Sequence, residues 1–193
     1  MDGDGMTLSP EQLEAALAEH VSVRFQALPG RTNHLEAAIA VPVTWDDDEP
    51  FVYLTRRVMS LPHGGELCFP GGKPDPTDTS LYATACRELK EELGARASAH
   101  LGRLSSVPVY TSDYRLEPFV VRLAPGRFAP NPDEVSEVHR LSLLVALRAS
   151  STMAIAYQRG DHEGLSPIYA IEDIWLYGAS AHVFRELCVV AAR

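Results

Sequence analysis

The sequence predicts an α/β protein in which a small mixed sheet lies between helices. Strand-like and helix-like segments alternate along the 193 residues. One uninterrupted helical segment, from about Asp78 to Leu93, follows a strand-like run that ends at Pro70-Gly71-Gly72. An apolar content of 46% and a charged content of 22% are ordinary for a globular chain. We therefore expect residues 1–193 to form a single domain, with residues 1–6 disordered.

The remaining elements follow from caps, apolar runs and turn residues. The run from Ser9 to Gln12 forms a capping box that opens a helix ending near His20. The four acids at 46–49 favour an exposed hairpin turn over a metal site. In the last helix, Trp175 and Phe184 are expected in the core rather than on a ligand platform. Strands are expected over 32–45, 51–56, 101–108, 117–123, 133–138, 153–158 and 168–171, a loop over 159–164, and helices over 141–148 and 174–192.

The helix after the Gly-Gly turn carries the residues that suggest chemistry. Asp78, Thr79 or Ser80 can cap it, and Gly94 supplies a left-handed stop. Its apolar stripe is formed by Leu81, Ala85 and Leu89, with Tyr82, Cys86 and Leu93 beside them.

Three glutamates, Glu88, Glu91 and Glu92, stand at i, i+3 and i+4 of this helix, which places three carboxylates on one side. Like charges repel, and a hard divalent cation such as Mg²⁺ removes the repulsion and takes oxygen ligands of this kind. The alternative is a solvated acidic face with Arg87 and Lys90 as partial partners.

The charge and cysteine content narrow the class of protein. A net charge of −9 argues against binding to nucleic acid or to an anionic membrane surface. Three cysteines in apolar or helical contexts indicate reduced thiols, and the N-terminus shows no signal region, so we expect a cytoplasmic location.

The order of strand, Gly-Gly turn, loop and helix resembles the Nudix box, the signature of hydrolases that cleave a nucleoside diphosphate linked to another group. The core pattern R-E-U-x-E-E-x-G is present without a gap from Arg87 to Gly94, with Leu89 as the apolar position. The segment from Gly72 to Arg87 is one residue longer than in the usual box. Asp78 or Thr79 lies where the loop glutamate of the box would fall.

The extended loop and its flanks are similar to the coenzyme A pyrophosphatase branch of the Nudix family. The loop reads GGK-x-DP-x-D from Gly71 to Asp78. Upstream, Leu54 to Arg57 matches L-T-x-R, and His63 to Gly72 is similar to H-x-G-x-V-x-F-P-G-G. Downstream, the string TSxYxxEPFV covers 111–120. In place of the arginine usual before the histidine, this chain has Leu61-Pro62.

The resemblance implies a Nudix-type α/β/α sandwich with a mixed β-sheet and a metal-dependent reaction. Mg²⁺ or Mn²⁺ is then held by Glu88, Glu91 and Glu92, and Arg87 orients these carboxylates. An acid near the entry of the 133–138 strand, Glu134 or Glu137, completes the metal site or acts as the base. The resemblance also implies substrate-binding residues, namely Arg56, Arg57, His63, Gly71, Gly72 and Lys73.

The implied activity is hydrolysis of the diphosphate linkage of coenzyme A or its thioesters to 3′,5′-ADP and 4′-phosphopantetheine or its acyl form. The alternatives are a Nudix diphosphatase for ADP-ribose, NADH or a dinucleotide, and a non-catalytic nucleotide-sensing domain. By residue type alone, Arg56, Arg57 and His63 are better explained as edge-strand and turn residues. Their positions in the family-like strings make phosphate contact an equal alternative for the two arginines, but not for His63. The expected partner is a small-molecule substrate, with homodimer formation left open.

Overall fold

The computed structural model describes residues 7–148, 153–159, 162–171 and 174–193. The predicted disorder of residues 1–6 concerns residues outside this set. Within the described ranges, no helix is both long and apolar enough to cross a bilayer. The elements in chain order are α1 (Pro10–Glu19), β1 (Leu35–Asp46), β2 (Glu49–Arg57), β3 (Leu67–Cys68), β4 (Gly71–Gly72), α2 (Leu81–Leu93), β5 (Ala97–Arg103), β6 (Val107–Pro108), β7 (Tyr114–Leu123), β8 (Val135–Ser142), α3 (Leu143–Arg148), β9 (Met153–Arg159), β10 (His162–Ile171), β11 (Ile174–Leu176) and α4 (Gly178–Ala191).

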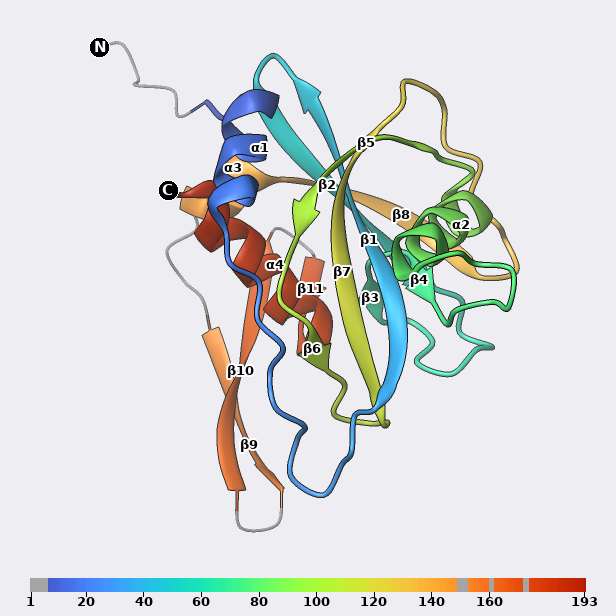
Figure 1. Cartoon of the computed structure of the whole chain (residues 1–193), viewed down its shortest axis with the longest axis vertical. Helices are drawn as coiled ribbons and strands as arrows, with labels where there is room; N and C mark the ends of the chain where they lie inside the picture. The colour runs from blue at the N-terminus through green and yellow to red at the C-terminus, as the bar shows by residue number, and fades with distance from the viewer. Residues whose placement is uncertain (1–6, 149–152, 160–161, 172–173) are drawn as a thin grey trace.

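The main sheet is mixed, with the strand order β3-β2-β1-β7-β5 (Figure 1). Its centre is the parallel pair β1 and β7, and β1 also pairs antiparallel with β2. β4 adds to β1, β6 adds to β7 and β8 adds to β2. A second sheet of order β11-β10-β9 lies beside α4. The predicted mixed sheet is confirmed.

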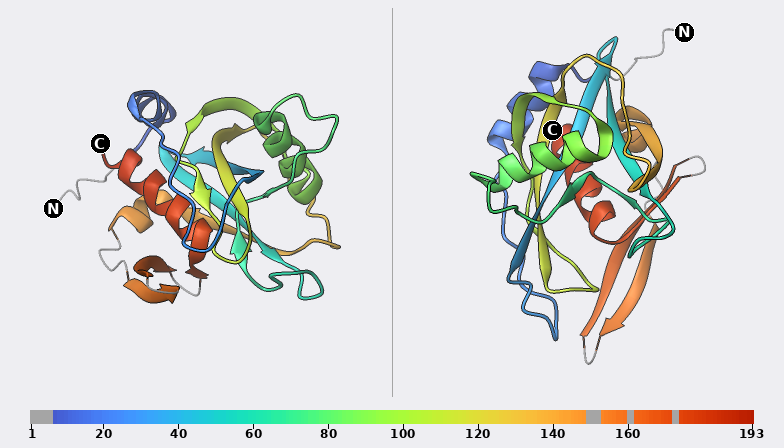
Figure 2. Two further views of the ribbon diagram at one scale, coloured as in Figure 1. Left: turned by 60° about the horizontal axis from the view of Figure 1, so that its bottom comes forward. Right: turned by 90° about the vertical axis from the view of Figure 1, so that its right-hand side faces the viewer.

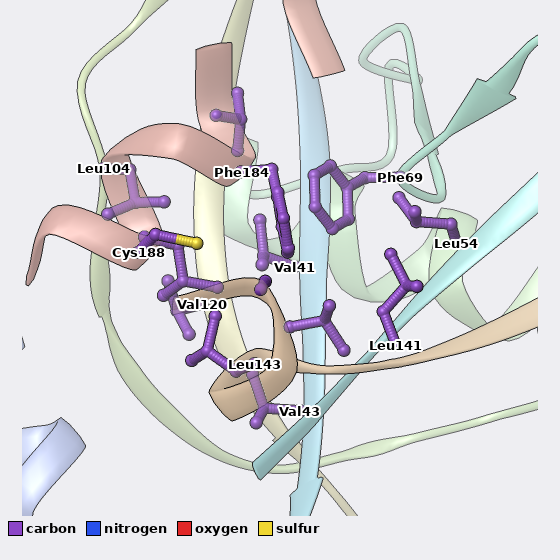
Figure 3. Packing of buried hydrophobic residues seen from close by; sticks show 14 of the residues in the cluster. Val41, Val43, Leu54, Phe69, Leu104, Val120, Leu141, Leu143, Phe184 and Cys188 are labelled. Carbon is purple, nitrogen blue, oxygen red and sulfur yellow. The ribbon is translucent and has the colours of Figure 1, made fainter. Parts of the chain in front are cut away.

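Helices cover both faces of the main sheet, with α2 on one face and α1 and α4 on the other (Figure 2). The alternation of side chains along β1 explains these layers. Val41 and Val43 belong to the large apolar cluster on the α4 side, where Phe184 is fully buried (Figure 3). Ala38 and Ala40 belong to the cluster on the α2 side. Because alanine is small, this face lets α2 lie close to the sheet.

The elements with the clearest end signals form as predicted. In α1, the Ser9 side chain accepts from the Gln12 N–H, and the Gln12 side chain accepts from the Ser9 N–H. The acidic hairpin joins β1 to β2, with φ angles of 46° and 61° at Asp47 and Asp48. Aspartate tolerates this left-handed backbone better than most residues, so the acids serve a turn.

The predicted single strand over 101–108 is wrong, because its pairing with β7 is interrupted between two shorter strands. β5 ends at Arg103 and β6 starts at Val107. Between them, the Leu104 N–H donates to the Pro118 carbonyl, and the Ser106 N–H donates to the Val23 carbonyl. The apolar character of this stretch indicates burial but does not reveal the break in the ladder.

The C-terminal region differs from the prediction at two places. The expected loop over 159–164 is wrong at Arg159 and from His162 onward, because these residues belong to the paired strands β9 and β10; residues 160–161 lie outside the described set. The expected helix over 174–192 begins only at Gly178, after the short strand β11. Ile174 and Leu176 are buried while Trp175 is 55% exposed, a strand-like alternation that pairs with β10. The expected core position of Trp175 is therefore wrong.

Candidate active site

The helix α2 presents its carboxylates to the Gly-Gly turn and to β2. It begins where the Ser80 side chain accepts from the Ala83 N–H, and it ends at Gly94, whose φ is 65°. Ala85, Leu89 and Leu93 are buried against the sheet, which fixes the rotation of the helix about its axis. The predicted helix, its cap and its left-handed stop are confirmed.

Glu92 is the most buried of the three carboxylates, with 2% of the residue exposed. Its Oε1 accepts from the Gly71 N–H at 3.0 Å, and its Oε2 accepts from the Thr55 hydroxyl at 3.2 Å. Burial raises the pKa of Glu92 to about 7; the two hydrogen bonds oppose the shift, and the charges of Glu88 and Glu134 add to it. This carboxylate is therefore held in place but poorly neutralised.

Thr55 was not predicted as a site residue, although it lies inside the L-T-x-R string. Its hydroxyl is fully buried in β2, and it also contacts the Cys68 carbonyl at 3.3 Å. The signal that could have identified it is a threonine that directly follows the apolar run of a buried strand, where a hydroxyl needs a polar partner.

Glu88 lies directly against the Gly-Gly turn. A Cβ atom at Gly72 would lie 2.3 Å from Oε1 of Glu88, so only glycine leaves room for this carboxylate. Burial raises the pKa of Glu88, Arg87 lowers it, and the charges of Glu91 and Glu134 raise it further. Glu91, by contrast, has a side chain that is 51% exposed.

Arg87 connects the helix to the preceding loop. Its Nη1 donates to Glu88 at 2.9 Å and to Glu91 at 2.7 Å, and its Nη2 donates to the Lys73 carbonyl at 2.9 Å. Its Nε and Nη2 donate to Asp78. Arg87 therefore orients two carboxylates and the loop together, in agreement with the role that the resemblance implies.

Asp78, considered in the sequence only as a cap and as the counterpart of the missing loop glutamate, is part of this network. Its side chain is 7% exposed. It accepts from the Asp75 N–H and from Arg87, and these hydrogen bonds, with that from Arg87 the larger, lower its pKa to about 2. Asp78 thus anchors Arg87 from the side opposite to the glutamates.

The Gly-Gly turn is held by the central strand. Gly71 and Gly72 pair with Ile39 and Ala38 of β1, and the Ala40 N–H donates to the Pro70 carbonyl at 2.8 Å. A Cβ atom at Gly71 would lie 2.4 Å from the Ala38 carbonyl oxygen. The backbone N–H of Gly71 is therefore fixed where it meets Glu92.

The basic residues predicted to bind substrate lie around this turn in different roles. Lys73 lies over the Tyr114 ring, with Nζ 5.1 Å from the ring centre. Arg56 donates to the Gly65 carbonyl at 3.1 Å and to Glu137 at 2.9 Å. Arg57 donates to the Pro62 carbonyl at 3.1 Å.

His63 belongs to the loop that these arginines support. Its φ is 62°, and its Nδ1 lies 3.2 Å from Glu66. No contact joins His63 to Glu88, Glu91 or Glu92 within the described residues. His63 therefore follows Pro62, the residue that Arg57 holds, and its side chain contacts Glu66.

The two candidate acids after the loop at 124–132 differ in their surroundings. The charge of Glu134 raises the pKa of both Glu88 and Glu92, after the larger effect of burial in each case. Glu137 has a side chain that is 57% exposed and is paired with Arg56 and His139. Of the two acids, Glu134 is the one whose charge acts on the buried carboxylates.

The donor chemistry of this site fits a hard divalent cation. Glu88, Glu92 and Glu134 supply carboxylate oxygens, and beyond the larger effect of burial the charges of neighbouring glutamates raise the pKa of Glu88 and of Glu92. Carboxylate oxygens are the ligands that such a cation prefers. As the side chains stand, no three His, Cys, Asp or Glu residues in the described part of the chain converge on one point. Arg87 occupies Glu88 and Glu91, so a cation would compete with Arg87 for these oxygens.

The fold and this loop-helix arrangement define a Nudix domain, and the chain matches the Nudix domain family over residues 34–159. The chain belongs to the Nudix hydrolase family, as the box pattern implied. Relatives named uncharacterized Nudix hydrolase NudL occur in Yersinia enterocolitica, 37% identical over 89% of this chain and 91% of the relative, and in Cronobacter sakazakii, 32% identical over 95% and 97%.

Solved structures show the same fold. A MutT/nudix family protein from Enterococcus faecalis has a TM-score of 0.51 and 15% identity, covering 97% of this chain and 74% of its own. The Nudix domain of Shewanella oneidensis NrtR, solved as a complex with ADP ribose, has a TM-score of 0.50 and 22% identity, covering 69% and 85%. The α/β fold and the assignment as an enzyme are confirmed.

Proposed function

We propose that this Nudix hydrolase cleaves the diphosphate linkage of coenzyme A or its thioesters, with Mg²⁺ or Mn²⁺ as cofactor. The observation that carries the proposal is the meeting of three strings around the Gly-Gly turn. Thr55 and Arg56 of the L-T-x-R string pair with Cys68 and Leu67 of the string that leads into the turn. Tyr114 of the TSxYxxEPFV string lies under Lys73.

The roles of the residues follow from their contacts. Glu88, Glu91 and Glu92 would hold the cation, which when bound polarises a phosphate oxygen and makes water more acidic. Arg87 and Asp78 position the first two glutamates through the network described above.

Residues around the three glutamates would accept the proton of the attacking water and bind the phosphate oxygens. Glu134 would accept the proton of the attacking water, because its charge already acts on Glu88 and Glu92. Lys73 and Arg56 would donate charge-assisted hydrogen bonds to phosphate oxygens. Glu137 would then hold Arg56 in place rather than act as a base.

The three free thiols and the phosphate-linked small-molecule substrate support a cytoplasmic location. Cys68 and Cys188 have raised pKa values, about 11 and about 12, mainly because they are buried. They are therefore unreactive thiols with a packing role.

Product identification by mass spectrometry tests the proposal directly. The full chain is incubated with coenzyme A, ADP-ribose and NADH, each with Mg²⁺ or Mn²⁺ and each again after exhaustive treatment with EDTA. We expect 3′,5′-ADP and 4′-phosphopantetheine from coenzyme A, and no product after chelation. Full activity without a divalent cation would contradict the metal chemistry.

A separate result would overturn the substrate assignment. The absence of the arginine before His63, where Leu61-Pro62 stands, argues against coenzyme A, and ADP-ribose, NADH or a dinucleotide are the alternative substrates. Efficient hydrolysis of these compounds beside negligible turnover of coenzyme A would overturn the assignment and leave the diphosphatase chemistry intact.

Arg56→Ala and Arg57→Ala sharpen the substrate test. If either arginine contacts the 3′-phosphate, its loss should raise KM for coenzyme A by roughly tenfold more than KM for dephospho-coenzyme A. Equal changes in the two KM values would remove this role.

A further inference from the structure

A cavity of about 510 Å³ opens at the end of the main sheet, near the C-terminal end of α2. Its walls come from the end of β1 at Thr44 and Trp45, from Tyr53 of β2, and from the segment 122–128 that follows the end of β7. The β1–β2 hairpin and the chain that leaves β7 lie at the same end of the molecule (Figure 1). A cavity of this size is large enough for a small organic ligand.

The charged side chains of this cavity are all basic. Arg96, Arg122 and Arg127 line it, and none of the described lining residues is acidic. None of these arginines forms an ion pair within the described part of the chain. A concentration of positive charge in a protein with a net charge of −9 favours an anionic ligand.

Arg122 is the best positioned of the three. Its guanidinium lies over the Trp45 ring, 5.2 Å from the ring centre, and its Nε is buried without a hydrogen-bond partner among the described residues. The pKa of Glu11 is lowered by its own backbone N–H, by the Ser9 hydroxyl and then by Arg122, but Glu11 does not pair with Arg122. The buried donor therefore lacks a partner that an anion would supply.

Aromatic side chains give the same cavity an apolar wall. Trp45, Tyr53 and Phe128 line it, and the Tyr53 and Phe128 rings meet edge to face with centres 4.7 Å apart. The Trp45 Nε1 donates to the Leu8 carbonyl, which fixes the indole. A wall of rings beside arginines suits a ligand that combines an aromatic ring with phosphate.

The cavity is separate from the candidate active site. Tyr53 and Phe128 pack with Leu93 in the cluster on the α2 side, and Glu92 points to Thr55 and Gly71 instead. None of Glu88, Glu91, Glu92 and Glu134 lines the cavity. A ligand here would therefore leave the carboxylates open.

We propose that this cavity is a second ligand site, which binds a nucleotide through Arg96, Arg122 and Arg127 and through its aromatic wall. The site is distinct from the hydrolytic one and does not depend on the identity of the hydrolysed substrate. ADP is the probe, because it joins a diphosphate to a ring.

Calorimetric titration of the full chain with ADP in EDTA tests the proposal. EDTA removes divalent cations, so the diphosphate of ADP has no cation to bind at the glutamates of the candidate active site. We expect saturable binding at one site, weakened about tenfold in Arg127→Gln and in Arg96→Gln, because each removes one charge-assisted hydrogen bond. Arg185→Gln, an exposed arginine of α4 outside the cavity, is the matched control and should retain the affinity.

The fluorescence of Trp45 gives a second, independent test of where ADP binds. The chain has two tryptophans, so Trp175→Phe leaves Trp45 as the only one, and ADP should change its fluorescence with the same Kd. Inorganic pyrophosphate and adenosine should each bind about tenfold more weakly than ADP, since each lacks half of the ligand.

Three results would overturn the proposal. The first is the absence of saturable ADP binding. The second is loss of binding in Lys73→Ala or Arg56→Ala but not in Arg127→Gln, which would assign ADP to the active site. The third is pyrophosphate binding as tightly as ADP, which would remove the ring from the ligand class. Arg96 and Arg127 are exposed, so their variants are expected to fold, and melting curves check this.

Discussion

Two glutamates one helical turn apart, the half-buried Glu88 and the buried Glu92, lie close enough for the charge of Glu88 to add to the effect of burial and raise the pKa of Glu92. A protein that needed only stability would not keep this pair, because neutral side chains of the same shape avoid the repulsion. The hydrogen bonds from Gly71 and Thr55 hold Glu92 in place without cancelling its charge.

The first prediction is that Glu88→Gln and Glu92→Gln lower kcat by roughly a hundredfold or more while the fold persists. Glutamine keeps the shape and removes the charge. Steady-state kinetics and melting curves measure the two effects. Glu14→Gln on α1, an exposed glutamate, serves as the control. Normal turnover per folded molecule together with a collapsed melting temperature would make both glutamates structural.

The second prediction concerns pH in the metal-free protein. The pKa of Glu92 is raised from 4.5 to about 7, so between these values the unfolded chain has lost a proton that the folded chain keeps. The free energy of unfolding therefore falls as pH rises through this window, by up to about 3 kcal/mol.

Glu92→Gln should be more stable than the wild type at about pH 8 and no more stable near pH 4.5. Thermal melts of both proteins in EDTA across this pH range measure the difference in stability between them. Titration of the other groups affects both proteins equally and cancels in this difference. A difference independent of pH would show that Glu92 does not titrate in this window.

Among the elements, the Gly-Gly turn offers a contrast between two neighbouring positions. A Cβ atom at Gly71 meets the backbone of Ala38, which cannot move without breaking the pairing with β1, whereas a Cβ atom at Gly72 meets the mobile end of Glu88.

The third prediction is therefore that Gly71→Ala lowers the melting temperature by roughly 5–10 °C. Gly72→Ala should change stability little but reduce kcat by roughly tenfold or more, since it displaces Glu88. Gly126→Ala, where a Cβ atom meets nothing within 4 Å, is the control. Equal losses of stability at Gly71 and Gly72 would contradict the assignment.

Sequence signals predicted the elements whose ends are marked by side chains. The capping box at Ser9, the acidic hairpin and the stop at Gly94 depend on interactions between residues a few positions apart. A short stretch of sequence is therefore enough to predict them. The strand Ile174–Leu176 was missed because its alternation exists only against β10, a tertiary partner. The box likewise singled out Glu88 and Glu92 as candidate ligands, whereas the contacts of Thr55 and Asp78 depend on neighbours that only the fold brings together.

At the scale of the whole molecule, the proposed cation binding would be linked to folding. The fourth prediction is that Mg²⁺ at a hundred times its Kd stabilises the wild type by about 2.7 kcal/mol, since the unfolded chain does not assemble the carboxylates. This corresponds to roughly 5–10 °C in melting temperature. Glu88→Gln should lose most of the shift, and an equal shift in both proteins would exclude these carboxylates as the site.

The parallel pairing of β1 with β7 joins segments roughly 80 residues apart in the chain. Such pairing must close a long loop before any contact stabilises it, which makes it a slow step in folding. Local pieces such as the β1–β2 hairpin can form early, but the floor beneath α2 is complete only when β7 has joined β1. A chain emerging from the ribosome therefore has only β1, β2 and β4 to pack against α2 until residue 123 is free, so the surface that supports the candidate active site is completed late in folding.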